Sequence, residues 1–206
     1  MEPLTLVVGS KNHSSWSLRP WLALREAGVP FREVVVALDR PDTKENLARW
    51  SPSEKVPVLH HGALVIWDSL AIVEYVHELY PDRGLWPADL GARALARAVS
   101  AEMHASFAAL RTCCPMDLHS RRPGPGDGPG VDADIARIHA IWTTCLARSG
   151  GPFLFGSFCA ADAFYAPVIG RFRTYGKPIP AALAPYADAV CGLPGMVEWV
   201  EAARIE

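Results

Sequence analysis

The stretch LTLVVGSKNHSSWSLRPWLALREAG, residues 4–28, joins two apolar patterns through a polar junction. Its first part, Leu4–Gly9, is a short apolar run that ends in glycine, and such a run predicts a buried strand. Its last part, Ser17–Ala27, carries apolar side chains at helical spacing and is followed by Gly28, a typical residue at a helix C-terminus. The stretch therefore predicts a strand followed by a helix.

The residues up to position 80 continue with alternating strand and helix patterns. A Val-rich run favours a strand, and two further apolar runs flank His61-Gly62, which predicts a tight hairpin turn. We predict strands at Phe31–Leu38, Val56–His60 and Leu64–Ile66, and helices at Lys44–Trp50 and Leu70–Leu79. This order predicts a mixed sheet with helices packed on it, in a domain over residues 1–80.

Proline and glycine punctuate the chain after this domain, and only helical patterns follow. Residues 81–91 hold two prolines and two glycines and predict a linker, and the Pro/Gly-rich residues 121–130 predict a loop. Helical spacing recurs over Ala92–Cys114, Asp132–Ser149, Cys159–Tyr175, Ala181–Val190 and Pro194–Ala203. The sequence therefore predicts a fold of class α/β plus all-α, with a helical bundle over residues 92–206.

Composition and charge narrow the classes of function. The 206 residues carry a formal net charge of −2 with no basic excess in either half, so binding to nucleic acid is not favoured. No apolar run approaches the roughly 20 residues of a membrane span, and the N-terminus lacks the pattern of a secretion signal. The five cysteines form no CxxC pair and favour a reducing compartment, so we expect a cytoplasmic protein. The seven histidines show no spacing typical of a metal site.

Three short motifs lie where the predicted elements join. They are NHSSWSLR at residues 12–19, KVPVL at residues 55–59 and WDSLAI at residues 67–72. In this order and spacing they resemble the cytosolic glutathione transferase family, and the Ser-Ser-x-Ser-x-Arg pattern is most similar to the zeta class and its bacterial relatives. The resemblance covers nearly the whole chain. It implies a thioredoxin-like glutathione-binding domain followed by an all-helical domain.

The first motif bears on the activation of the glutathione thiol. A free thiol has a pKa of about 8.5, and its thiolate is the form that attacks an electrophile. A hydroxyl donor and a helix N-terminus each stabilise a thiolate by roughly 1 kcal/mol, and Ser14 and Ser15 stand just before the first helix. The resemblance gives Ser14 the thiol-activating position, with Ser15 as the alternative. Either serine could also simply cap the helix.

The second and third motifs bear on the binding of glutathione as co-substrate. The resemblance implies a cis peptide between Val56 and Pro57, whose exposed edge pairs with the glutathione backbone. Lys55 could reach a glutathione carboxylate or remain solvated. At the next helix start, Ser69 and the helix N–H groups are expected to receive the γ-glutamyl carboxylate, and Asp68 its ammonium group. The family usually has Glu or Gln in place of Asp68, and this pair of residues could also cap the helix.

The pocket for a second substrate is expected beside the first helix of the helical domain. One side of that helix would carry Met103, Phe107, Leu110, Arg111 and Cys114, and ordinary core packing is the alternative for most of them. Trp16 stands where the zeta pattern has cysteine, and it could wall the pocket or pack in the core. Since residues 1–112 hold no cysteine, a mechanism that uses a protein thiolate at this junction is disfavoured.

One more motif, FCAAD at residues 158–162, resembles a buried N-capping box of the same family. The box normally begins with Ser or Thr, and the thiol of Cys159 is a weaker hydrogen-bond partner than a hydroxyl. We expect Asp162 to cap the helix that follows and to take no part in catalysis.

Together with the resemblance, these residues predict an enzyme, a glutathione S-transferase whose activated thiol attacks a small electrophile. The reaction could be conjugation, isomerisation of a maleyl-type diketo acid or reduction of a peroxide, and detoxification is the implied setting. The alternative is a non-catalytic protein that binds glutathione or another ligand, or serves as an interaction module. The resemblance further implies a two-fold homodimer.

Overall fold

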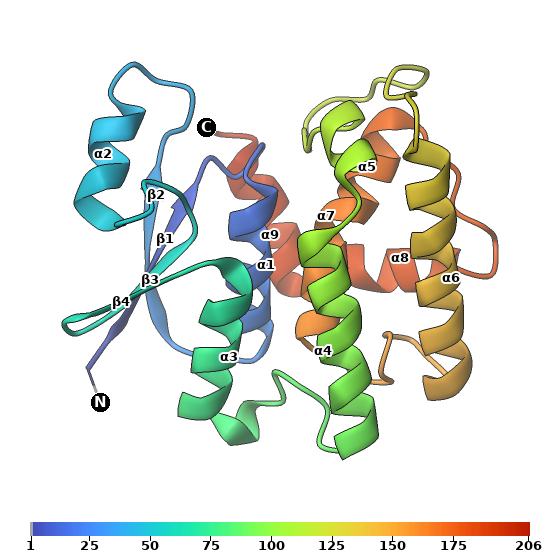
Figure 1. Cartoon of the computed structure of the whole chain (residues 1–206), viewed down its shortest axis with the longest axis horizontal. Coiled ribbons are helices and arrows are strands. Elements are labelled where there is room, and N and C mark those ends of the chain that lie inside the picture. The colour runs from blue at the N-terminus through green and yellow to red at the C-terminus, as the bar shows by residue number, and fades with distance from the viewer. Residues whose placement is uncertain (1) are drawn as a thin grey trace.

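Residues 2–206 are described by a computed structural model, in which a sheet-containing part and a helical part lie side by side (Figure 1). The first part runs in the order β1 (Leu4–Gly9), α1 (Ser15–Glu26), β2 (Phe31–Val36), α2 (Thr43–Trp50), β3 (Val58–His61), β4 (Leu64–Trp67) and α3 (Ser69–Leu79). Its strands form one mixed sheet in the order β2-β1-β3-β4, in which β1 and β2 are parallel and the other neighbours antiparallel. The predicted order of strands and helices is confirmed.

The central strand β1 is buried because both faces of the sheet are covered. Its side chains alternate: Leu6 and Val8 belong to the large hydrophobic core, whereas Val7 belongs to a small core with Leu47 of α2. Figure 1 shows α2 on the outer side of the sheet, with α1 and α3 between the sheet and the helical part. Burial on both faces explains why the sequence of β1 is a continuous apolar run.

The helical part is built around α7, which is almost wholly buried. After a 3-10 turn at Pro81–Arg83 come α4 (Leu90–Ala105), α5 (Ala108–Cys113), α6 (Val131–Ser149), α7 (Ala160–Tyr175), α8 (Ala184–Cys191) and α9 (Pro194–Ala203). Every residue of α7 except Arg173 is buried. Helix α1 packs against α7, so Leu18 and Trp21 share one core with Phe164 and Phe172. The predicted all-helical second part is confirmed, and its core is continuous with that of the first part.

The single helix expected over Ala92–Cys114 is instead two helices, and this prediction is wrong. Helix α4 ends before Ser106, which is extended, and Phe107 adopts a left-handed conformation with φ 62°. That conformation costs a residue with a side chain about 1–2 kcal/mol, but the Phe107 side chain is buried in the core. The N–H of Leu110, in the first turn of α5, donates to Asp134 of α6 at 2.9 Å. Helical spacing does not reveal the break because the apolar period continues across it.

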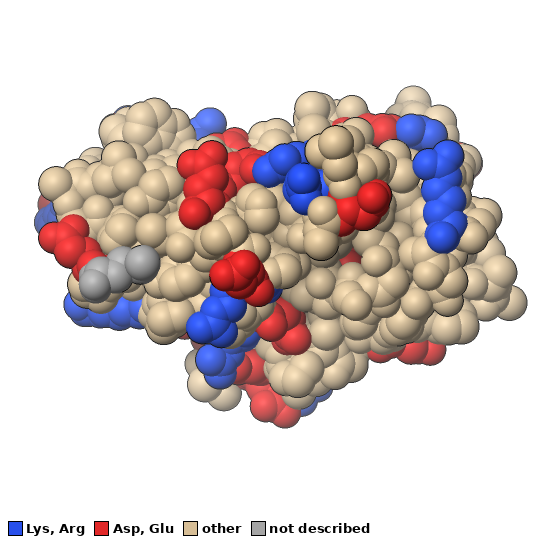
Figure 2. Space-filling model, turned by 90° about the horizontal axis from the view of Figure 1, so that it is seen from below, with Lys and Arg blue, Asp and Glu red and all other residues tan. Residues whose placement is uncertain are grey.

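Charged side chains are mixed on the surface. Figure 2 shows acidic and basic residues interspersed on one face, without a continuous field of either sign. Within residues 2–206, none of the helices is both long enough and apolar enough to cross a membrane.

Asp162 closes the start of α7 inside the core. Its carboxylate accepts the backbone N–H of Cys159 at 2.9 Å and that of Leu154 at 3.0 Å. Burial raises the pKa of this carboxyl to about 6. The predicted capping role is confirmed, and the second acceptor contact also fixes the loop before α7.

We predict that Asp162→Ala lowers the free energy of unfolding by about 2–4 kcal/mol, because two buried N–H groups lose their acceptor. Urea unfolding at pH 7 measures this difference. Asp188→Ala is the matched control, since Asp188 is exposed and pairs with Arg173 on the surface at 2.9 Å, where a loss below about 1 kcal/mol is expected. Equal losses in the two variants would contradict the capping role.

Candidate active site

A cavity of about 430 Å³ lies between the two parts of the molecule, where α1, the loop before β3, the start of α3 and the end of α4 meet. Its lining consists of Trp16, Ser53, Lys55, Val56, Pro57, Trp67, Asp68, Ser69 and His104. The volume falls in the range of about 300–1,000 Å³ that is typical of small-ligand sites. All five residues predicted to hold glutathione therefore line one cavity, together with Trp16. The peptide between Val56 and Pro57 is cis, as the resemblance implies.

The start of α3 contributes a strained residue and a free hydroxyl to the cavity. Asp68 has φ 78°, a conformation unusual for any residue but glycine. Its carboxylate accepts the N–H of Leu70 at 2.9 Å and lies 3.1 Å from Nε2 of His104. The Ser69 hydroxyl is buried, and no residue in the described part of the chain gives it a hydrogen-bond partner. A buried hydroxyl at a helix N-terminus is suited to an anionic ligand group.

The hydroxyls of Ser14 and Ser15 lie at the start of α1, and neither residue is among those that line the cavity. The Ser14 hydroxyl donates to Ser17 Oγ at 2.8 Å, and Ser17 Oγ also accepts the N–H of Gly9. The Ser15 hydroxyl accepts a hydrogen bond from Arg171 at 3.1 Å. Ser14 occupies the N-cap position of α1 without a side-chain capping bond. Both hydroxyls are thus held beside the positive end of the helix.

Three arginines, Arg19, Arg111 and Arg171, give the region next to Trp16 a positive charge. The Arg19 guanidinium is fully buried, lies 4.1 Å from the centre of the Trp16 ring, and has no hydrogen-bond partner within residues 2–206. Burial, followed by the charges of Arg171 and Arg111, lowers its pKa to about 9. Arg111 lies 5.3 Å from the same ring. This cluster favours a ligand with negative charge on the side of the cavity that Trp16 forms.

Sequence reasoning missed His104, which closes the cavity from α4. Its ring meets Trp16 edge-on at 5.1 Å between centres, and its Nε2 contacts Asp68. Burial lowers the pKa of His104, the Asp68 carboxylate opposes that effect, and Arg19 and Arg111 add to it. No local pattern marks this residue, because its place in the site depends on how the helical part packs against the sheet part.

The other residues expected in the second-substrate pocket divide into two groups. Met103 and Phe107 are buried in the hydrophobic core and do not line the cavity. Arg111 is half-buried, and its guanidinium donates to the carbonyl of His104 at 3.0 Å while facing the Trp16 ring. The structure therefore brings Trp16, Arg111 and His104 together and leaves Met103 and Phe107 apart from them.

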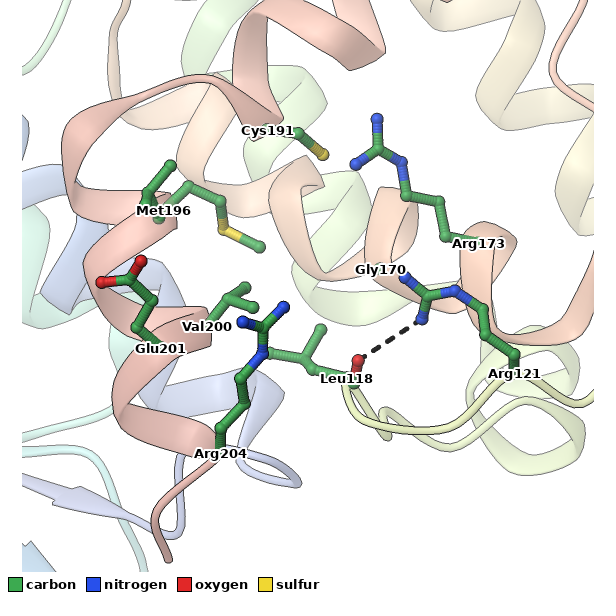
Figure 3. Close-up of a pocket in the computed structure, with 10 residues that line it drawn as sticks. Leu118, Arg121, Gly170, Arg173, Cys191, Met196, Val200, Glu201 and Arg204 are labelled. Carbon is green, nitrogen blue, oxygen red and sulfur yellow. Dashed lines mark hydrogen bonds between the residues drawn. The ribbon is translucent and has the colours of Figure 1, made fainter.

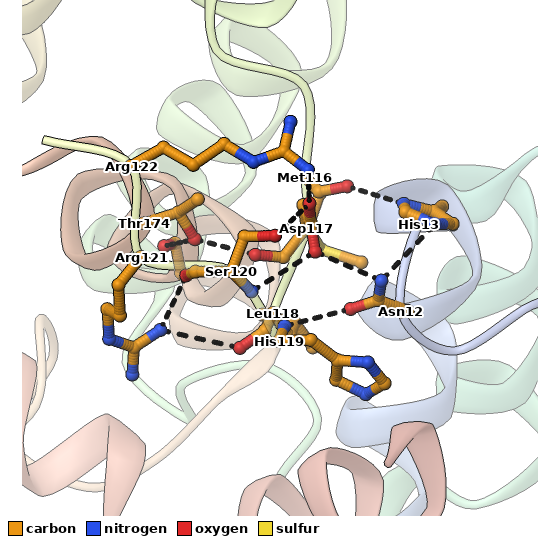
Figure 4. A network of polar contacts seen from close by, with 11 residues as sticks. Asn12, His13, Met116, Asp117, Leu118, His119, Ser120, Arg121, Arg122 and Thr174 are labelled. Atoms are coloured by element: carbon orange, nitrogen blue, oxygen red, sulfur yellow. Dashed lines mark hydrogen bonds and ion pairs between the residues drawn. The ribbon is translucent and has the colours of Figure 1, made fainter. Parts of the chain in front are cut away.

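The junction before α1 is held by a polar network centred on Asp117 (Figure 4). Asn12 donates to the Asp117 carboxylate at 3.1 Å and accepts the N–H of His119 at 3.0 Å. Ser120 and Arg122 also contact that carboxylate. Burial raises the pKa of Asp117, but these hydrogen bonds and the Arg122 charge outweigh burial and lower it overall. The network ties the segment that carries Ser14 to the helical part.

The structure combines this sheet order, a cis-proline loop and a cavity shared with a helical bundle. This combination is typical of thioredoxin-like proteins that bind a thiol-containing peptide and form a second pocket next to it. The family profile described as "Glutathione S-transferase, N-terminal domain" matches residues 13–79, and "Glutathione S-transferase, C-terminal domain" matches residues 93–202. The chain belongs to the glutathione S-transferase family, and glutathione is its co-substrate.

Individual relatives agree with this assignment. A probable maleylacetoacetate isomerase of Caenorhabditis elegans is 37% identical over a match that covers 82% of this chain and 80% of the relative. A maleylpyruvate isomerase of a Ralstonia species is 29% identical, with 87% and 88% covered. A crystal structure of a Burkholderia glutathione transferase homologue with bound glutathione has the same fold, with a TM-score of 0.75, 24% identity and 99% of each chain covered.

We predict that Asp68→Asn lowers the pKa of His104 further, because the substitution removes the one carboxylate that raises it. Asparagine has nearly the same size and shape as aspartate, so the substitution removes the charge and little else. An NMR titration of the histidine ring protons measures the shift. His139 is the control, since burial alone lowers its pKa and its titration should not change. An unchanged or raised pKa for His104 would show that Asp68 does not act on it.

Proposed function

We propose that this enzyme acts with glutathione on a small electrophile that carries a carboxylate, by conjugation or by isomerisation of a double bond. The observation that carries the proposal is a single cavity lined by the cis-proline loop, the start of α3 and Trp16, with Arg19 and Arg111 against the Trp16 ring. Relatives named as isomerases of maleylacetoacetate and maleylpyruvate support it, since both compounds are carboxylic acids.

The residues of the cis-proline loop and of α3 would hold glutathione. The backbone of Val56, before Pro57, would pair with the cysteinyl backbone of the tripeptide as a short added strand. The buried Ser69 hydroxyl, without a partner in the described part of the chain, and the first N–H groups of α3 would receive the γ-glutamyl carboxylate. Lys55 lies at the rim and would meet another carboxylate of the tripeptide.

Asp68 would contact the ammonium group of the γ-glutamyl residue. One carboxylate oxygen of Asp68 is occupied by the N–H of Leu70, and the other lies against His104. The ammonium would therefore share the second oxygen with His104. Because the aspartate side chain is short, the ammonium would have to lie close to Asp68 to make this contact.

Ser14 would stabilise the glutathione thiolate, and Ser15 is the alternative. Rotation of the Ser14 hydroxyl away from Ser17 would direct its proton toward the sulfur. The sulfur would then lie at the N-terminal end of α1, where the helix dipole also favours an anion. Ser15 has support of its own, because its oxygen already accepts from Arg171 and its proton is free to be donated. The thiol proton is released to solvent in either case.

The thiolate would then add to an activated double bond of the electrophile. As the carbon–sulfur bond forms, the π electrons of the double bond move onto the activating group. In isomerisation the former double bond rotates, and the carbon–sulfur bond then breaks, which restores the double bond and the glutathione thiolate. In conjugation the other carbon of the former double bond takes up a proton from solvent, and the carbon–sulfur bond persists. Trp16 would form one wall of the pocket for the electrophile. Arg111 and Arg19, which both lie against the Trp16 ring, would attract the carboxylate of the electrophile.

One observation favours a second candidate, binding without turnover. The hydroxyls of Ser14 and Ser15 are engaged with other side chains, and neither residue lines the cavity. A substrate panel at saturating glutathione, run beside calorimetry of glutathione binding, separates the two candidates.

The family also supports assembly as a two-fold homodimer, a cytoplasmic location and a role in detoxification. In such a dimer the sheet part of one chain would face the helical part of its partner. Light scattering at micromolar concentration distinguishes a pair from a single chain.

We predict that Ser69→Ala weakens glutathione binding by about 1–2 kcal/mol, because a hydrogen bond to a charged group is lost. Isothermal calorimetry measures this change. Ser100→Ala is a matched control: Ser100 is also a buried serine without a partner in residues 2–206, but it lies in α4 outside the cavity. An unchanged affinity of the Ser69 variant for glutathione would contradict the role of Ser69 in glutathione binding.

We predict that Ser14→Ala raises the pKa of the bound glutathione thiol and lowers turnover roughly fivefold near neutral pH, as expected for the loss of about 1 kcal/mol of thiolate stabilisation. Glutathione affinity should change less, since most of the tripeptide is held elsewhere. Titration of the thiolate absorbance in the ultraviolet reports the pKa of the complex.

Ser15→Ala is the internal control for that experiment. If Ser15→Ala moves the titration and Ser14→Ala does not, the two serines exchange roles. If neither variant moves it, activation by a serine hydroxyl is wrong for this protein, and backbone N–H groups of α1 become the source of stabilisation.

A further inference from the structure

His104 and Asp68 contact each other in the candidate active-site cavity, and both of them line it. Nε2 of His104 lies 3.1 Å from one carboxylate oxygen of Asp68, and the other oxygen accepts the N–H of Leu70 at 2.9 Å. The γ-glutamyl ammonium of glutathione, if it binds at Asp68 as proposed, would use the oxygen that His104 already contacts. His104 is therefore a neighbour of the ligand as well as of Asp68.

The charge of the His104 ring decides how strongly it holds that oxygen. A neutral ring donates one N–H to Asp68 and leaves the negative charge of the carboxylate in place. A protonated ring forms a charge-assisted hydrogen bond, which is roughly twice as strong, and cancels that charge. An ammonium group at the same oxygen is thus attracted when His104 is neutral and opposed by a second cation when His104 is protonated.

The surroundings of Nδ1, the other ring nitrogen of His104, favour the neutral form. Nδ1 is buried and has no hydrogen-bond partner in the described part of the chain. If the neutral ring keeps its proton on Nε2, facing Asp68, Nδ1 carries no N–H. Protonation would add a buried N–H without an acceptor, which is unfavourable.

The other charged groups near this ring are cationic. Burial lowers the pKa of the histidine, the Asp68 carboxylate opposes this effect, and Arg19 of α1 and Arg111 of α5 lower the pKa further. Lys55 lines the same cavity from the loop before β3. Tyr165 of α7, the helix packed against α4, adds no charge, since burial raises its pKa. A ligand ammonium would therefore join a set of positive groups that Asp68 balances.

We propose that His104 determines which ligands the site accepts, because a proton on His104 and the ammonium of glutathione compete for one oxygen of Asp68. This inference rests on the proposed placement of the γ-glutamyl ammonium at Asp68. With His104 neutral, Asp68 receives the ammonium. With His104 protonated, Asp68 is paired with His104, and the site loses its preference for a ligand that carries an ammonium group. Glutathione therefore displaces a proton from any His104 that is protonated in the free enzyme.

The competition fixes the direction of the pH dependence. The pKa of His104 is lowered from its ordinary value of 6.5, so the charged form gains ground only below that pH. Affinity for glutathione is full above the pKa of His104 and falls as the pH drops through it. Well below that pKa, the loss approaches about tenfold for each pH unit.

Calorimetry with S-methylglutathione tests the inference on the full chain, because the methyl group prevents the thiol from releasing a proton of its own. Titrations in two buffers that differ in ionisation enthalpy give the number of protons released. At the pKa that an NMR titration gives for His104 in the free chain, binding should release about half a proton and be about twofold weaker than at about pH 7.5. The analogue with a glutaryl group in place of the γ-glutamyl group lacks the ammonium and should release no proton.

Two variants identify the source of the proton. His104→Gln keeps an N–H donor toward Asp68 but cannot take a charge, so it should bind S-methylglutathione without releasing a proton. His77→Gln is the matched control: His77 is a half-buried histidine of α3 whose pKa burial also lowers, but it does not line the cavity. This control should release the same half proton as the unaltered chain. Thermal unfolding of each variant checks that the fold is retained.

A ligand bound in the other cavity shown in Figure 3 would not disturb this count. That cavity of about 280 Å³ lies among α7, α8, α9 and the segment that follows α5, and it shares no lining residue with the active-site cavity. Its lining within residues 2–206 contains no histidine, the side chain whose ordinary pKa lies between about 5 and 8. Proton release that depends on His104 therefore reports on the active-site cavity.

The possible outcomes separate this inference from the proposed glutathione site. Equal proton release by the unaltered chain and His104→Gln, or by S-methylglutathione and the glutaryl analogue, would overturn the inference. Binding of S-methylglutathione without proton release at the pKa of His104 would overturn it too, while leaving the glutathione site in place. If S-methylglutathione does not bind at about pH 7.5, the glutathione site fails and the inference fails with it.

Discussion

The packing of α1 against α7 is the contact on which the other features of the molecule depend. Helix α1 belongs to the sheet part and begins at Ser15, whereas α7 is the buried centre of the helical part. Because the two helices share one hydrophobic core, the first turn of α1 is fixed relative to α4. Trp16 from α1 and His104 from α4 can therefore close the same cavity. Each part alone would leave that cavity without a wall.

Two buried arginines lie at this contact, and apolar packing does not require them. The Arg171 guanidinium has polar partners that include the Ser15 hydroxyl. Within residues 2–206, Arg19 has no hydrogen-bond partner and lies against the rings of Trp16 and Phe164. Burying an unpaired cation costs several kcal/mol, and a desolvated cation–π contact returns about 2 kcal/mol. With a pKa of about 9, Arg19 stays charged at neutral pH. A buried charge that lowers the stability of the fold is expected where that charge serves binding or catalysis.

Local sequence patterns were sufficient for the sheet part because each strand and helix there has its own turn residues. They failed where distant residues decide the conformation. The break before Phe107 is stabilised by its burial and by Asp134, which lies more than twenty positions further along the chain. Likewise, Met103 and His104 are neighbours on α4, and only the rotation of α4 against α1 decides that Met103 enters the core and His104 the cavity. Helical spacing identifies a buried side, but not the partner that buries it.

The junction that carries Ser14 is held by residues far away in the sequence. Asn12 contacts Asp117 through its side chain, and its backbone N–H donates to the carboxylate of Glu206 near the C-terminus. The Asp117 carboxylate is buried and held by Asn12, Ser120 and Arg122, and this multiple bonding favours a single arrangement. The segment therefore holds the N-terminal end of α1, and with it Ser14, in one position relative to the helical part.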